Sequence, residues 1–122
     1  MTMEPTKEQI LEEQRMVAKT IVDQIKAFDV TALMAYGAKD FVALTQDSNR
    51  RGGLAFKVNG LRHKGWVEIN LTWADLYQVK TARVRKGERI YKDERNEVYF
   101  DELVTVLDAF VEGRGYDNST TH

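Results

Sequence analysis

Cations gather in the middle of the sequence, where several aromatic residues also lie. Residues 50–95 hold 12 Lys and Arg against 5 Asp and Glu, whereas residues 1–49 hold 5 against 8 and residues 96–122 hold 1 against 6. Cationic side chains bind phosphates, and exposed aromatic rings stack on bases. This chemistry selects as candidate binding residues Trp66, Tyr77, Arg83, Arg85, Lys86 and Arg89. Acidic helices beside the basic segment would neutralise it instead, so a binding surface and a purely structural one remain alternatives.

A second basic feature lies in the segment 46–53, QDSNRRGG. Its polar, glycine-rich composition predicts a loop with Arg50 and Arg51 at the tip. Such a loop can bind phosphate, but the G-x-x-x-x-G-K-[ST] pattern is absent and no helix is predicted after it. Arg50 and Arg51 complete the set of candidate binding residues.

No residues are spaced for catalysis or metal binding. The sequence has no cysteine, which excludes a thiolate nucleophile, a cysteine metal site and a disulfide framework. His63 is the one histidine outside the C-terminal tail, and we expect it to be exposed among cations. Asp93 and Glu94 are adjacent, so on a strand they point to opposite faces. We therefore expect a protein that is not an enzyme and has no catalytic residue, metal site or cofactor.

The elements that must position these residues centre on a predicted antiparallel sheet. Asn59-Gly60 favours a two-residue type I′ hairpin turn, because both central residues of that turn need a positive φ. Residues 67–71 alternate apolar and polar, which predicts a strand with its apolar side buried and Trp66 on the outer face. Residues 76–85 form a long predicted strand whose pattern does not choose a buried face, and residues 89–92 a charged edge strand.

Helices are predicted at both ends of this sheet. A capping box at Thr6 and Gln9 predicts a helix from Thr6 to about Phe28, and a short second helix ends at Gly37, before a first strand over 41–45. The last helix is predicted to begin at residue 96 or 97 and to end at Gly113. The fold class is therefore α+β: about four to five antiparallel strands covered on one face by a long N-terminal helix and a C-terminal helix. We expect one domain over residues 1–113 and a disordered tail over 114–122.

Six ordered segments lie between about Val17 and Val111: VAKTIVDQI, LMAYGAKDFVAL, LAFKV, VEINL followed by DLYQV, VRKG and VYFDEL. In this order they resemble a family of small, mostly uncharacterised proteins of bacteriophages and other mobile elements. That family has Thr where this chain has Tyr36 and Asn where it has Asp40, and its N-terminal helix is shorter. The resemblance implies a phage or prophage origin and an α+β fold, and it brings no established activity or functional residue.

Size, the lack of a catalytic pattern and this resemblance together predict a function. We expect a non-enzymatic phage accessory protein in the host cytoplasm that modulates a host protein, such as a defence, transcription or replication factor. The alternative is nucleic-acid or nucleotide-ligand binding through the basic sheet face. No secretory signal or membrane-length apolar window is present, so we expect no membrane association. Exposed sheet edges leave monomer and homodimer open.

Overall fold

A computed structural model describes residues 4–115 of the chain. It begins with helix α1 (Lys7–Phe28), whose N-cap Thr6 accepts a hydrogen bond from the Gln9 backbone while the Gln9 side chain accepts one from the Thr6 backbone. The predicted capping box and helix length are confirmed. A short helix α2 (Ala32–Ala35) follows, and the chain then turns at Gly37, whose φ of 65° is the left-handed conformation that glycine adopts without strain.

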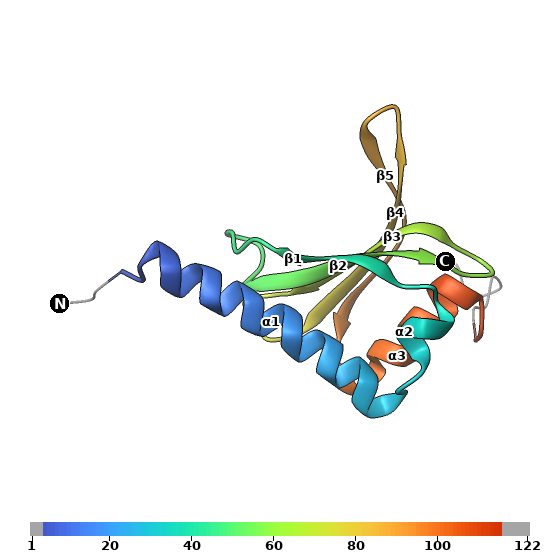
Figure 1. Cartoon of the computed structure of the whole chain (residues 1–122), viewed down its shortest axis with the longest axis horizontal. Helices are drawn as coiled ribbons and strands as arrows, with labels where there is room; N and C mark the ends of the chain where they lie inside the picture. The colour runs from blue at the N-terminus through green and yellow to red at the C-terminus, as the bar shows by residue number, and fades with distance from the viewer. Residues whose placement is uncertain (1–3, 116–122) are drawn as a thin grey trace.

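Five antiparallel strands then form one sheet in chain order. They are β1 (Lys39–Leu44), β2 (Gly52–Asn59), β3 (Lys64–Leu71), β4 (Tyr77–Arg85) and β5 (Glu88–Val98). Because the order is a simple meander, β1 and β5 are the two edges. The β4–β5 hairpin is long and twisted, and Figure 1 shows its tip projecting away from the rest of the sheet.

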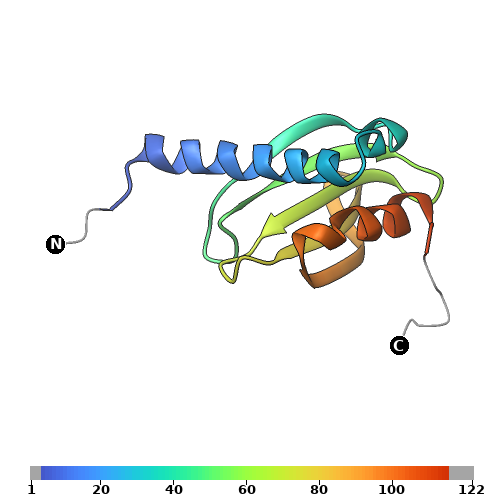
Figure 2. The ribbon, with the colours of Figure 1, turned by 90° about the horizontal axis from the view of Figure 1, so that it is seen from below.

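Helices cover one face of this sheet, and within residues 4–115 no helix lies on the other. Figure 1 shows α1, α2 and α3 on the same side, and Figure 2, turned toward that side, shows α1 and the C-terminal helix in front of the strands. Val67, Ile69 and Val79 are fully buried beneath them, with Ile21 and Ile25 of α1 packed against the sheet in the same core. The predicted α+β fold with helices on one face is confirmed, as is the burial of the apolar side of β3.

The end of the chain differs from the prediction. Residues 96 and 97 belong to β5 and do not begin a helix, because β5 continues to Val98 to pair with Tyr77 at the start of β4. A turn of 3-10 helix η1 (Phe100–Glu102), helix α3 (Leu103–Leu107) and a π-helical turn η2 (Asp108–Glu112) follow. Gly113, with φ of 81°, ends them as predicted. Of the tail predicted to be disordered, residues 116–122 lie outside the described residues.

The hairpin between β2 and β3 lies where Asn59-Gly60 predicts it, but its turn is of another kind. Asn59 pairs with Lys64, so the loop has four residues, 60–63, and is not a two-residue type I′ turn. The backbone N–H groups of Arg62 and His63 both donate to the carbonyl of Val111, at 2.9 and 3.0 Å. Docking against η2 therefore determines the shape of this loop.

Candidate functional site

The face of the sheet opposite the helices is polar and charged. Residues directly opposite each other in antiparallel strands share a face, and the register aligns Lys57 with Trp66 and Trp66 with Ala82. Glu68 and Lys80 are aligned in the same way on this face. The prediction that Trp66 lies on the outer face is therefore confirmed, and we call this surface the outer face.

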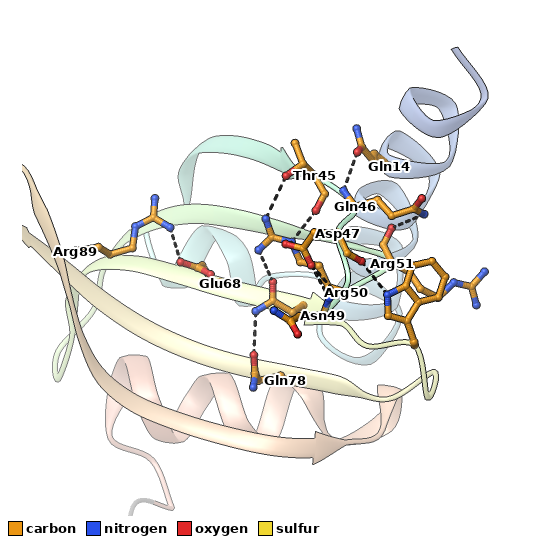
Figure 3. A network of polar contacts seen from close by, with 12 residues as sticks. Gln14, Thr45, Gln46, Asp47, Asn49, Arg50, Arg51, Glu68, Gln78 and Arg89 are labelled. Atoms are coloured by element: carbon orange, nitrogen blue, oxygen red, sulfur yellow. Dashed lines mark hydrogen bonds and ion pairs between the residues drawn. The ribbon is translucent and has the colours of Figure 1, made fainter. Parts of the chain in front are cut away.

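Arg50, one of the predicted phosphate-binding residues, is bound within the protein at one end of the outer face (Figure 3). Its Nε donates to the backbone oxygen of Thr45 at 2.7 Å, and its Nη1 donates to the Asn70 side-chain oxygen at 3.0 Å. Asn70 is buried and in turn donates to Gln78 at 3.2 Å. Arg50 thus holds the β1–β2 loop on the sheet, and its guanidinium is not a free cation for a ligand.

Arg51 is also bound internally. Its Nη1 lies 2.6 Å from Asp75 and its Nη2 lies 3.2 Å from Glu13 of α1, and its guanidinium carbon lies 5.8 Å from the centre of the Trp73 ring. Hydrogen bonds with Asp75 and then Glu13 raise the pKa of Arg51 above its ordinary value. The phosphate loop proposed for residues 46–53 is therefore corrected: Arg51 joins that loop to α1 and to the turn before β4, and Arg50 joins it to β3.

Two of the other predicted residues are also engaged or buried. The Tyr77 ring is only 5% exposed and its hydroxyl donates to Gln24 at 2.6 Å, so it cannot stack on a ligand. Burial raises the pKa of Tyr77. Arg89 lies 2.5 Å from Glu68, a buried carboxylate that also accepts from the Tyr91 hydroxyl at 2.9 Å. Arg89 therefore neutralises Glu68 on the outer face.

Trp66 and Arg83 come together at the other end of the outer face. They line an open cleft of about 410 Å³ whose remaining walls are Lys57, Lys64, Gly65 and Val84. Arg85 and Lys86 follow at the exposed tip of the β4–β5 hairpin. Within residues 4–115, Lys64, Arg83, Arg85 and Lys86 form no ion pair with an acidic side chain. We call these four residues with Lys57 the basic cluster.

His63 lies beneath this cleft and is 1% exposed, which corrects the expectation of a solvated imidazole. Its Nε2 lies 3.0 Å from the backbone oxygen of Trp66, so the ring donates its proton to that carbonyl. Burial lowers the pKa of His63, and the nearby charges of Lys92, Asp93 and Arg62 partly offset one another. The neutral ring is a structural support of the β2–β3 loop.

The predicted arrangement of Asp93 and Glu94 is confirmed. Asp93 binds Arg62 at 2.7 Å and Thr81 at 3.2 Å, whereas Glu94 lies 3.6 Å from Lys80 on the outer face. Burial alone would raise the pKa of Asp93, but hydrogen bonds and charge from Arg62 lower it overall. Over residues 4–115, no three acidic or histidine side chains are grouped so that they could hold a metal ion.

An apolar groove beside the β1 edge is the feature that the sequence patterns did not indicate. It measures about 460 Å³ and is lined by Val22, Lys26, Leu33, Met34, Ala38 and Phe41. Met34 is 83% exposed and Phe41 48% exposed, and Val42 beside it is exposed to a similar degree. We call this the edge groove, since it runs between α1, α2 and the strand that ends the sheet.

A signal for this groove existed in the sequence. Phe41 and Val42 are consecutive apolar residues, so on a strand one of them faces away from the core unless a further element covers it. The prediction gave a strand here without placing it in the sheet, and the meander makes it an edge. Asp40, with φ of 56°, forms a bulge opposite residues 55–57 and limits regular pairing to the end of the strand.

Comparisons with known proteins add no relative: no family model, curated protein or solved structure matches the chain. The resemblance to a phage family stays a prediction. None of the helices within residues 4–115 combines the length and the apolar character needed to cross a bilayer.

Proposed function

We propose that this protein acts without catalysis, by binding an extended segment of another protein at the edge groove. The observation that carries this proposal is the exposure of Met34 and Phe41 on a groove of about 460 Å³ next to an open sheet edge, with Val42 exposed beside Phe41 on the same edge strand. Exposed apolar side chains that gather in one place typically mark a protein-interaction site. If the chain is of phage origin, the partner is a host protein.

The geometry favours an extended partner segment. An edge strand carries backbone N–H and C=O groups on its open side, and a partner strand can add to them while its alternate side chains enter a neighbouring pocket. Such side chains would contact Phe41 and Met34. Complete burial of an exposed side chain of this kind is worth about 1.5–3 kcal/mol, so Met34, at 83% exposed, has more to contribute to binding than Phe41, at 48% exposed.

The lysines at the edge groove set a second requirement for the partner segment. Lys26 lines the edge groove, and Lys39 is exposed at the start of β1. A segment that carries acidic residues beside its apolar ones would pair with both. The opposite edge, β5, is densely charged with residues such as Arg89, Lys92 and Glu94, and charge of this kind disfavours strand addition.

The test is affinity capture from a bacterial lysate with the tagged protein and two variants, Met34→Glu and Met16→Glu. Met16 is an exposed methionine of α1 outside the edge groove, so Met16→Glu is the matched control. We expect wild type and Met16→Glu to recover the same discrete protein in stoichiometric amount, with nuclease and moderate salt present, and Met34→Glu to lose it. Recovery by all three would place the partner elsewhere, and recovery by none would remove the proposal.

Hydrogen exchange then tests the docking mode. With the captured partner bound, we expect slower exchange of backbone amides in residues 41–44, because a strand added to β1 would bond to them. Unchanged exchange there would contradict strand addition. A dimer of this chain that Met34→Glu disrupts would instead assign the groove to a second copy.

A further inference from the structure

We propose that the outer face binds single-stranded nucleic acid, with bases stacked on Trp66 and Tyr91 and phosphates held by Lys57, Lys64 and Arg83, the members of the basic cluster that line the cleft. This activity is separate from partner binding, since the edge groove lies on the helix side of the sheet and uses none of these residues.

Two aromatic rings stand on the outer face with one small residue between them. Trp66 of β3 and Tyr91 of β5 are both aligned with Ala82 of β4, one on each side, so all three share a face. Strands two apart in a sheet are separated by about 10 Å. Tyr91 is 49% exposed, and Trp66 is partly exposed in the cleft. Rings spaced in this way on an uncovered sheet can each stack on a base.

Cations surround these rings and continue along the hairpin. Lys57 lies 5.5 Å from the centre of the Trp66 ring, and Lys80 lies 4.9 Å from that of Tyr91. On β4, Arg83 and Arg85 alternate with Ala82 and Val84, so their row lies on the other side of the strand from the two rings. Arg83 nevertheless lines the cleft beside Trp66, together with Lys57 and Lys64. These three cations are the ones placed to hold phosphates next to a base stacked on Trp66.

The charge balance of this part of the molecule favours a polyanion. Residues 57–92 contain nine Lys and Arg and three Asp and Glu, a net charge of +6, although the whole chain carries −1. The two carboxylates on the outer face near the rings are compensated, since Glu68 is bound by Arg89 and Glu94 lies 3.6 Å from Lys80. Within residues 4–115, the acidic partner of the basic cluster is therefore limited to Asp40, which lies 4.0 Å from Lys57.

The two aromatic rings favour nucleic acid over an acidic protein as the ligand, and single-stranded over double-stranded nucleic acid. An acidic peptide would need only the cations, whereas two aromatic platforms suit planar bases. In a duplex the base faces are already stacked on one another, so the rings would have nothing to contact. A single-stranded nucleic acid can stack its bases on the rings and place its phosphates against the cations.

The test is the anisotropy of a fluorescently labelled oligothymidylate of about 12 nucleotides, a length within the site sizes of single-strand-binding domains. We expect the logarithm of the affinity to fall with the logarithm of salt concentration at a slope of about −2, from about three phosphate contacts. The variants Trp66→Ala and Tyr91→Ala should each weaken binding by about tenfold, since stacking on one base is lost. Trp66→Phe should retain most of the affinity, because a flat ring remains.

Charge variants provide the matched control. Lys57→Gln with Lys64→Gln should reduce the slope to about a third, whereas Arg15→Gln with Lys19→Gln removes the same charge from exposed residues of α1 and should leave binding unchanged. Equal losses from both pairs would mean unspecific attraction and overturn the proposal. No binding at low salt, tighter binding of a matched duplex, or equal binding of polyglutamate would overturn it as well.

Discussion

Two connections in this protein carry a pair of arginines close to glycine: the β1–β2 loop with Arg50 and Arg51, and the β4–β5 hairpin with Arg83 and Arg85. The first pair is bound to Thr45, Asn70, Glu13 and Asp75. The second pair forms no ion pair within residues 4–115 and stands on a hairpin that projects from the body (Figure 1). The availability of a cation is thus decided by whether other elements pack around its loop, and local composition does not reveal it.

The same contrast separates the turns after β2 and after β4. The four-residue loop at Gly60 is docked on η2 through the carbonyl of Val111, whereas a Cβ added at Gly87 would meet no atom within 4 Å beyond its chain neighbours. Docked loops contribute to stability, and the free hairpin is available for binding. Three experiments test this distinction between docked and free loops.

The largest effect is expected from Gly60→Ala. An added Cβ would lie 2.4 Å from both the backbone oxygen and a methyl carbon of Val111, so the loop or η2 must move. We expect a loss of about 3 kcal/mol in the free energy of unfolding, the upper end for overpacking, measured by urea denaturation. The control is Gly87→Ala, where the new Cβ meets nothing and only the positive φ of 78° costs about 1 kcal/mol. Equal losses would contradict the docked-loop description.

A smaller effect is expected from Arg50→Ala. The change leaves the buried Asn70 oxygen without its donor, which costs about 2 kcal/mol of unfolding free energy. Arg85→Ala, the matched change on the free hairpin, should alter stability by less than about 0.5 kcal/mol. Thermal denaturation of the two variants separates them, and a destabilised Arg85→Ala protein would show that the hairpin arginines are structural after all.

The smallest effect concerns pH and the docked β2–β3 loop. His63 is neutral in the fold, and burial holds its pKa below the ordinary value of 6.5. The His63 imidazole therefore takes up a proton more readily in the unfolded chain than in the fold. The stability that the neutral ring contributes is complete above pH 6.5, and it is lost as the pH falls from 6.5 through the lower pKa of the folded state. Denaturation midpoints between pH 7.5 and 5 should decline in wild type and decline less in His63→Gln. Parallel curves would assign the decline to other groups.

Part of this architecture could be predicted from the sequence because it depends on neighbouring residues. The capping box at Thr6, the left-handed glycines at 37 and 113 and the buried side of β3 all follow from patterns within a few positions. The outward position of Trp66 follows from the same alternation. The α+β class and the order of its elements were therefore predictable.

The tertiary structure decided the candidate sites. Arg51 meets partners 38 and 24 residues away in the sequence, Tyr77 is buried under α1 while Tyr91 takes the outer face, and the loop at Gly60 is shaped by Val111. The edge groove exists only because α1, α2 and β1 meet there. Alternation and capping act through the backbone over a few residues, whereas the exposure of a side chain depends on the distant segments that pack around it.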